Sequence, residues 1–258
     1  MTGHLFVGCS GWSYADWRGV VYPTELSKSR WFEHYTTMFD TVELNNTFYR
    51  LPNEATAVKW AESAPPGFVF SVKLGAFGSH RMKLRDPERW LAPHMLVFGA
   101  LGEHLGPTLV QLPPRWRRDA DRLDAFLRAA PRSSRWAVEL RDASWLHPST
   151  YEVLRRHNAA LCVHDLLANH PVEMTASWTY LRFHGPEAIE HPYRGRYGAE
   201  RLTPWSDRIS KWLRAGSDVY AYFNNDYDGH AVADATTLRQ LVEDRAASGQ
   251  EVAVDVGE

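Results

Sequence analysis

The segment TVELN (41–45) alternates apolar and polar side chains in the way that a strand does when its two faces meet different surroundings. Val42 and Leu44 share one face, and Glu43 and Asn45 share the other. In a barrel of parallel strands the outward side chains pack under helices and are apolar, so the polar pair is expected to face the barrel axis. The segment therefore predicts a barrel strand that carries a carboxylate and an amide inward.

Short apolar runs of this kind recur along the chain, bounded by turn residues and mostly separated by amphipathic segments. In order they are LFVGC (5–9), TVELN (41–45), FVFSVKL (68–74), PTLVQL (107–112), RWAVEL (135–140), ALCVHD (160–165), WTYLRFH (178–184) and DVYAYFN (218–224). Eight strands that alternate with helices are typical of an α/β protein with a parallel (β/α)₈ barrel. We expect residues 1–258 to form a single TIM-type barrel domain.

Two connections depart from the regular alternation of strand and helix. The segment between the sixth and seventh runs, LLANHPVEMTAS, is too short for a full crossover helix, so an abbreviated crossover is expected after strand six. The connection after the seventh run begins with a long loop, GPEAIEHPYRGRYGAERL. An open doubly wound sheet is the alternative, but GCSGW after the first run lacks the G-x-G-x-x-G pattern of its phosphate-binding turn.

Composition excludes several classes of protein. The 258 residues are 44% hydrophobic and 23% charged, and the formal net charge of −2 provides no overall positive field for nucleic acid. Two cysteines, Cys9 and Cys162, are too few for a disulfide framework or a zinc cluster. The beginning of the chain lacks the pattern of a signal peptide, and no stretch is apolar enough to span a bilayer, so a cytoplasmic protein without membrane contact is expected.

The same alternation assigns polar side chains to the interior of almost every strand, towards its C-terminal end. The set comprises Glu43, Asn45, Ser71, Lys73, Gln111, Glu139, Arg141, Tyr180, Arg182, His184, Tyr220, Tyr222 and Asn224, with Ser10 and His164 on the two strands whose pattern is ambiguous. Barrel enzymes keep their chemistry at this end, so the pattern predicts a ligand site. The alternative is an internal salt-bridge network without a ligand, although burying charges costs several kcal/mol each.

Seven blocks of the sequence, taken in order, resemble a known family. They are GCSGWSYADWRGVVYP, FDTVELNNTFYRLP, FVFSVKL, LVQLPP, VELRDASW, YLRFHG and YFNND, and they are similar to the signature blocks of domain-of-unknown-function family 72, also called YecE-like. The resemblance runs from Val7 to about Leu241. It implies a (β/α)₈ barrel with a common pocket, and it implies no activity. Ser79 and His80 stand where similar proteins have a Thr-His pair.

The polar set is compatible with several chemistries. Glu43 and Glu139 could flank a sugar for glycoside hydrolysis, although glycosidase barrels usually carry their acids on strands four and seven. Glu139, His164, Asp165 and His184 could converge on a divalent metal, but the neighbouring arginines would repel it, so no metal ligands are assigned and no cofactor is predicted. Arginine and lysine side chains suit a carboxylate or a phosphate better.

The leading hypothesis is an enzyme, with hydrolase, lyase or isomerase chemistry, acting on a small anionic or phosphorylated substrate that resembles a sugar or a nucleotide. Glu43 and Glu139 are the predicted acid–base residues, with Lys73 holding one of them ionised. The predicted substrate-binding residues are Trp12, Asn45, Tyr49, Gln111, Arg141, His164, Arg182, His184 and Asn224. Trp12 and Tyr49 are expected to shape the mouth of the pocket.

The competing hypothesis is a non-catalytic module that binds nucleic acid or a partner protein through aromatic and basic loops. Its only basic clusters are RMKLR (81–85) and RWRR (115–118), so nucleic acid is not the favoured partner. The long loop after the seventh run adds Tyr193, Arg194, Arg196 and Tyr197 to either hypothesis. The sequence leaves the substrate and the oligomeric state open.

Overall fold

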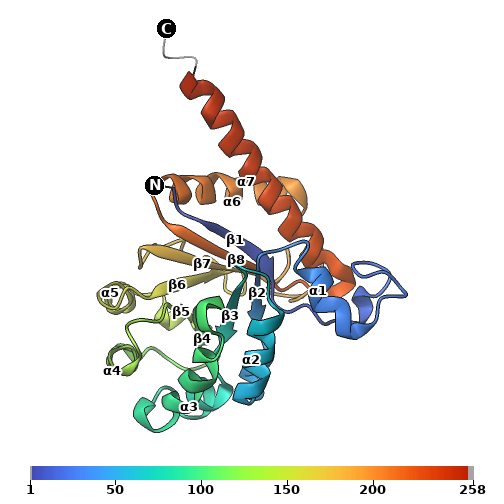
Figure 1. Cartoon of the computed structure of the whole chain (residues 1–258). Helices are drawn as coiled ribbons and strands as arrows, with labels where there is room; N and C mark the ends of the chain where they lie inside the picture. Colours follow the sequence, from blue (N-terminus) through green and yellow to red (C-terminus); the bar gives the residue numbers. More distant parts are fainter. Residues whose placement is uncertain (1, 255–258) are drawn as a thin grey trace.

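Eight parallel strands form one nearly closed barrel in the computed structural model, which describes residues 2–254 (Figure 1). The strands are β1 (Leu5–Cys9), β2 (Thr41–Leu44), β3 (Val69–Lys73), β4 (Leu105–Gln111), β5 (Trp136–Glu139), β6 (Ala160–His164), β7 (Trp178–Phe183) and β8 (Asp218–Phe223). They are hydrogen-bonded in the order β1-β8-β7-β6-β5-β4-β3-β2. The (β/α)₈ barrel is confirmed, and no expected strand end is more than two residues from the observed one.

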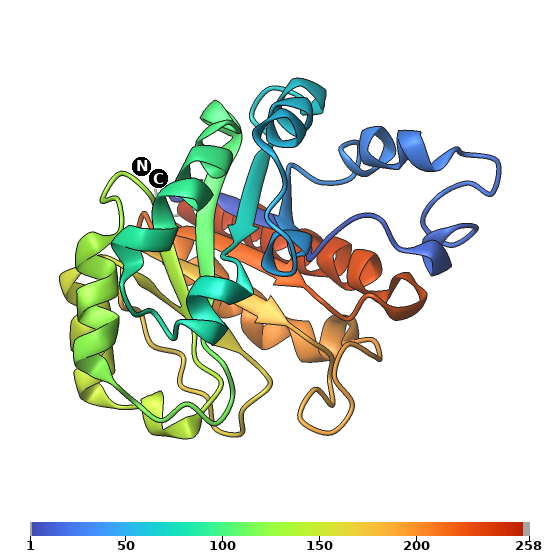
Figure 2. The same cartoon turned by 90° about the horizontal axis from the view of Figure 1, so that it is seen from below.

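Helices cover the outside of the barrel (Figures 1 and 2). They are α1 (Trp31–Tyr35), α2 (Glu54–Ser63), α3 (Pro87–Gly99), α4 (Ala120–Ala129), α5 (Pro148–Arg156), α6 (Gly198–Arg214) and α7 (His230–Val254). No helix forms between β6 and β7, which confirms the abbreviated crossover after strand six. Within residues 2–254, none of the helices combines the length and the apolar character needed to cross a membrane.

The barrel separates two hydrophobic clusters. The larger one lies between the sheet and the helices and contains the outward residues Val42, Leu44 and Val138. The smaller one includes Leu109, Cys162 and three stacked or tilted tyrosines of β7 and β8, namely Tyr180, Tyr220 and Tyr222. This inner cluster packs around the barrel axis, below the polar strand ends, and so provides a rigid floor for the site.

A tyrosine hydroxyl bridges β1 and β2, the two neighbouring strands that share no backbone ladder. The Tyr35 Oη atom accepts a hydrogen bond from the Cys9 N–H at 2.9 Å and donates one to the Thr41 carbonyl oxygen, also at 2.9 Å. Gly8 makes room for this arrangement, because a Cβ atom there would lie 2.3 Å from the Thr41 oxygen and 2.9 Å from Tyr35 Oη. We call this place the β1–β2 seam.

Replacing Tyr35 with phenylalanine is expected to lower the free energy of unfolding by about 1–3 kcal/mol, because the Cys9 N–H and the Thr41 carbonyl would stay buried without partners. Equilibrium urea unfolding measures the change. Tyr151→Phe is the matched control, since the Tyr151 side chain is only half-buried on α5. Equal stability of the two variants would contradict a bridging role for the Tyr35 hydroxyl.

Candidate functional site

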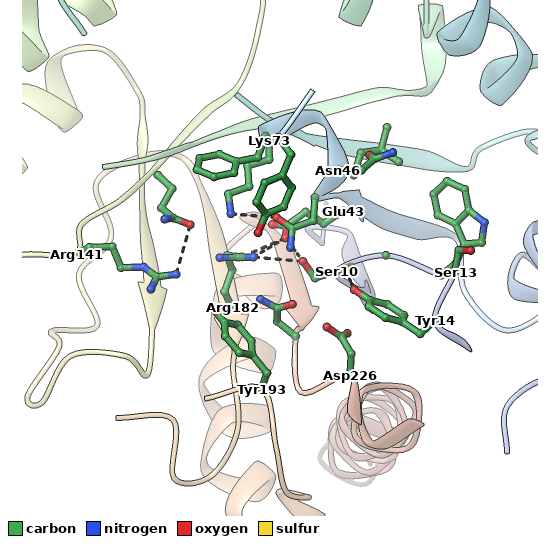
Figure 3. Close-up of a pocket in the computed structure, with 18 residues that line it drawn as sticks. Ser10, Ser13, Tyr14, Glu43, Asn46, Lys73, Arg141, Arg182, Tyr193 and Asp226 are labelled. Carbon is green, nitrogen blue, oxygen red and sulfur yellow. Dashed lines mark hydrogen bonds and ion pairs between the residues drawn. The ribbon is translucent and has the colours of Figure 1, made fainter. Parts of the chain in front are cut away.

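A cavity of about 530 Å³ opens at the C-terminal ends of the strands (Figure 3), and it is called the inner cavity below. Its volume lies in the usual range for small-molecule sites. Of the predicted site residues, those that line it are Trp12, Glu43, Asn45, Tyr49, Lys73, Gln111, Arg141, Arg182 and Asn224. Glu139, His164 and His184 are buried but do not line it. The structure thus brings most of the predicted set to one place.

Arg182 occupies the centre of a fully buried ion-pair cluster beneath the inner cavity. Its guanidinium group lies 2.8 Å from a carboxylate oxygen of Glu43 and 2.5 Å from one of Glu139. Its Nε atom also donates to Glu43 at 3.2 Å, and its remaining donors reach Ser10 and His184. All three guanidinium nitrogens have partners within the protein, so Arg182 is not free to bind an anion directly.

The two glutamates are ionised at neutral pH. Burial alone would raise the pKa of the Glu43 carboxyl, but the charges of Arg182 and Lys73 bring it below its ordinary value. Burial opposes ionisation of Glu139 as well, and the charges of Arg141 and Arg182 hold its pKa well below the usual range. A carboxylate in this state is a poor proton donor near pH 7. The geometry therefore favours Glu43 and Glu139 as partners of arginine over the acid–base role that the sequence suggested.

Both predicted histidines are tied to the protein by hydrogen bonds. His184 Nδ1 lies 3.0 Å from Asp165 Oδ1, and His164 Nε2 lies 2.8 Å from the Leu140 carbonyl oxygen, while its Nδ1 accepts from the Leu166 N–H. Burial lowers the pKa of each imidazole, for His164 to about 3, so both are neutral at physiological pH. These hydrogen bonds join the ends of neighbouring strands, so the two histidines are better suited to hold the strand ends in position than to contact a ligand.

Residues 2–254 contain no cluster of three or more His, Cys, Asp or Glu side chains arranged to hold a metal ion. The sequence suggested that Glu139, His164, Asp165 and His184 could bind one metal ion. In the structure Glu139 pairs with arginines, and His184 pairs with Asp165.

Lys73 places a buried ammonium group against the inner cavity. Its side chain is hydrogen-bonded through Nζ to Asn45 Oδ1 at 3.0 Å, and Nζ lies 4.4 Å from the centre of the Phe48 ring. No carboxylate in the described part of the chain comes within ion-pair distance of it. Burial, together with the charge of Arg182, lowers the pKa of Lys73 to about 8, although nearby carboxylates oppose the shift. Lys73 is therefore a cation at neutral pH.

Asp226 is a site residue that the sequence did not reveal, because it lies beyond the end of β8 where strand alternation no longer applies. It belongs to the NDYDGH stretch, whose resemblance to a calcium loop ends at a missing acidic ligand. Its Oδ1 atom is buried and has no hydrogen-bond partner. Burial raises the pKa of Asp226 to about 8, while a hydrogen bond from Tyr14 and the charge of Arg182 oppose the shift and Glu43 adds to it. The carboxyl is therefore protonated at neutral pH.

Hydrogen bonds from the protein fix Asp226 in place. The Trp17 indole N–H donates to its backbone oxygen at 2.7 Å. The Asn224 amide is oriented so that its nitrogen donates to Asp226 Oδ2 at 3.0 Å and its oxygen accepts from Arg182 at 3.2 Å. Lys73 and Asp226 approach the inner cavity from different sides (Figure 3). The site thus contains one cation and one neutral acid whose pKa values both lie near 8.

The aromatic residues of the loops at this end of the barrel divide into a buried group and a group that lines the inner cavity. Trp17 and Tyr22 are buried and pack under the loops, as does Trp145 after β5. Trp12 and Tyr49 line the inner cavity, and Tyr49 is 81% exposed at its mouth. Tyr14 and Tyr193 line the cavity as well. Tyr49 and Tyr193, the exposed members of the second group, supply flat faces on which a ring could stack.

The fold and the inner cavity define the chain as a (β/α)₈ barrel protein with a polar, cation-bearing pocket at the C-terminal ends of its strands. The family model described as "Protein of unknown function DUF72" matches residues 6–254. The chain belongs to this family. The resemblance seen in the seven sequence blocks is thereby confirmed.

Individual relatives agree with this assignment. The UPF0759 protein YunF of Bacillus subtilis (strain 168) is 25% identical, over 93% of this chain and 95% of that protein. The crystal structure of a DUF72 family protein from Thermotoga maritima MSB8 shares 30% identity and superimposes with a TM-score of 0.83, covering 93% of this chain and 99% of that one. A DUF72 family protein from Enterococcus faecalis V583, at 18% identity and a TM-score of 0.77, shares the fold over 93% of this chain and 95% of its own.

Proposed function

We propose that the protein is an enzyme that acts on a small anionic substrate, sugar- or nucleotide-like, bound in the inner cavity. The observation that carries the proposal is the buried Lys73 ammonium, which faces the cavity without a carboxylate partner. A buried cation is costly unless it is paired. An anionic group of the substrate, a phosphate or a carboxylate, would supply the missing partner.

The charge balance of the cluster supports an anion. Three cations, Lys73, Arg141 and Arg182, face the two carboxylates of Glu43 and Glu139 in the site. With Asp226 neutral, one positive charge remains. Arg141 borders the cavity and is partly exposed, so it is suited to bind the anion together with Lys73. Asn45 and Gln111 contact these two cations and would complete the binding site.

We assign the proton donor to a residue other than the two glutamates expected from the sequence. General acids and bases work best when their pKa values lie near the operating pH. Among the residues that line the inner cavity, Asp226 and Lys73 meet this condition, whereas Glu43 is held ionised by Arg182. We assign Asp226 as the proton donor and Lys73 as the residue that holds the anion, with Glu43 and Glu139 positioning the arginines.

Lys73→Met is expected to weaken the binding of anions by roughly tenfold to a hundredfold, because a charge-assisted hydrogen bond contributes about 1.5–3 kcal/mol. The measurement is a thermal-shift titration with sulfate, inorganic phosphate, sugar phosphates and nucleotides. A ligand at 100 times its Kd stabilises the fold by about 2.7 kcal/mol, which corresponds to several degrees. Lys59→Met, on the exposed side of α2, is the matched control and should bind as the wild type does.

Turnover separates an enzyme from a binding protein. Each compound that binds is incubated with the wild type and with Asp226→Asn, and its conversion is followed by NMR. Asp226→Asn should keep the affinity and lose the conversion. If every bound compound emerged unchanged from the wild type, the enzymatic part of the proposal would be wrong. If no anion bound at all, the whole proposal would be wrong.

A salt series distinguishes this site from the competing nucleic-acid hypothesis. Binding to a phosphate backbone weakens steeply with salt, whereas binding in a buried pocket weakens little. Neither basic cluster, at 81–85 or at 115–118, lines the inner cavity. We therefore favour the small-molecule site.

A further inference from the structure

A second cavity adjoins the inner one and has no role in the function proposed above. Its volume is about 380 Å³, and it is called the outer cavity here. Its lining residues come from the loops after β1, β7 and β8, namely Tyr14, Asp16, Pro192, Tyr193, Arg194, Asp226 and Tyr227. Tyr14, Tyr193 and Asp226 line both cavities, so the two adjoin at these three side chains.

Hydrogen bonds to the rest of the protein hold the first and third of these loops. The Asp16 carboxylate accepts from the Asp228 N–H at 3.0 Å, which ties the loop after β1 to the loop after β8. The indole of Trp17, next to Asp16, donates to the Asp226 carbonyl oxygen at 2.7 Å. The outer cavity therefore has two fixed walls formed by loops that lie far apart in the sequence.

The loop after β7 is held as firmly. Asn225 donates to the Gly195 carbonyl oxygen at 2.8 Å, and Tyr193 donates its N–H to the His184 carbonyl oxygen. Gly185, at φ 131°, lies so close to this loop that a Cβ atom there would be 2.3 Å from the Arg194 oxygen. Tyr193 itself adopts a left-handed conformation at φ 72°, which a residue with a large side chain rarely takes up. Uncommon backbone conformations of this kind cluster at active sites and ligand-binding sites.

The side chains of the outer cavity suit an uncharged ring with hydroxyl groups. Tyr193 and Tyr227 are 44% and 54% exposed, and the Arg194 guanidinium lies 5.2 Å from the centre of the Tyr227 ring. Asp16 and Arg194 contribute opposite charges, so the outer cavity lacks the excess positive charge of the inner one. Aromatic faces can stack against a sugar ring, while a carboxylate and a guanidinium exchange hydrogen bonds with its hydroxyls.

We propose that the outer cavity is a subsite for a neutral sugar unit, and that the substrate spans both cavities with its anionic group in the inner one. This inference rests on the proposed function, because it takes the anion at Lys73 as its starting point. Asp226 lines both cavities, so in this arrangement it lies next to the place where the two parts of the substrate are joined.

The test compares ligands with and without the sugar. Affinities of methyl phosphate and of a panel of pentose and hexose 1-phosphates are measured by isothermal titration calorimetry. At least one sugar phosphate should bind ten times more tightly than methyl phosphate. Tyr227→Ala and Arg194→Met should remove this gain and leave the affinity for methyl phosphate unchanged. Phe77→Ala, an exposed aromatic residue that lines neither cavity, is the matched control and should change nothing.

The outcomes separate the two proposals. If methyl phosphate bound but no sugar phosphate bound more tightly, or if Tyr227→Ala and Arg194→Met kept the full gain, the subsite would be disproved and the anion site would stand. If Tyr227→Ala weakened both kinds of ligand equally, the residue would act on the inner cavity, and the subsite would again be disproved. If neither methyl phosphate nor any sugar phosphate bound, the proposed function and the subsite would both fall.

Discussion

Replacing Arg182 with methionine is expected to lower the free energy of unfolding by about 3–5 kcal/mol, because it leaves buried carboxylates without their main partner. Glu43 would lose its only ion-pair partner in the described residues, and Glu139 would keep Arg141 alone. Both carboxylates are fully buried, so the guanidinium supplies most of what compensates their charge. Equilibrium unfolding in urea at pH 7 measures the loss.

Two further variants test the cause of this loss. When Glu43→Gln and Glu139→Gln are added to Arg182→Met, the three charges disappear together, and much of the stability should return. Arg30→Met is the matched control, because Arg30 forms an exposed ion pair with Glu33 and its removal should change little. A single Arg182→Met variant as stable as the wild type would show that the buried cluster does not depend on this residue.

Asp226→Asn is expected to be more stable than the wild type, by a margin that grows between about pH 4 and pH 8. The pKa of Asp226 is about 8 in the folded protein and 3.8 without the fold, so the wild type loses stability as the pH rises through this window. Asparagine has no proton to lose and avoids this loss. Each pH unit adds at most about 1.4 kcal/mol to the difference. Above pH 8 the difference should stay constant.

Urea unfolding at several pH values between 5 and 9 measures this margin. The matched control is Asp228→Asn, which makes the same chemical change at an exposed carboxylate two residues away. A margin for Asp226→Asn that did not change with pH would mean that Asp226 is already ionised at neutral pH. Its assignment as a proton donor would then be lost.

The sequence predicts the fold well because apolar and polar residues alternate along the strands. This alternation arises because the outward side chains of each strand must pack under helices. Val42 and Leu44 must pack under helices, so Glu43 has to face inward, and the structure buries it there completely. The same condition placed Lys73 and Gln111 at the inner cavity. The missing helix after β6 was predictable too, because the connecting segment is short.

The roles within the polar set could not be predicted in the same way. The alternation of apolar and polar residues indicates which face of a strand a side chain occupies. It does not indicate which atoms that side chain contacts. Arg182 and His184 share one face of β7, yet the guanidinium joins two glutamates across the barrel and the imidazole reaches Asp165. These pairings depend on distances between strands, which the sequence of a single chain does not contain.

Asp226 was missed for a related reason. Its position follows from the loop after β8, where no periodic pattern exists, and from a contact with Trp17 near the other end of the chain. Its unusual pKa arises from burial among neighbours that come from several loops. The exposed tyrosines and the basic loop after the seventh strand were visible in the sequence, but their meeting in one outer cavity was not.

The β1–β2 seam gives the barrel one weak point in its circumference. Any fluctuation that widens the barrel will concentrate there, since every other neighbouring pair of strands is joined by a backbone ladder. Ser10 directly follows β1 and donates a hydrogen bond to Glu43 of β2, so it spans the same gap just above Tyr35. Widening the seam would pull Ser10 away from Glu43, and Arg182, which donates to both, could no longer contact the two together. The distance between β1 and β2 and the hydrogen bonding of the buried Glu43 carboxylate are thus coupled.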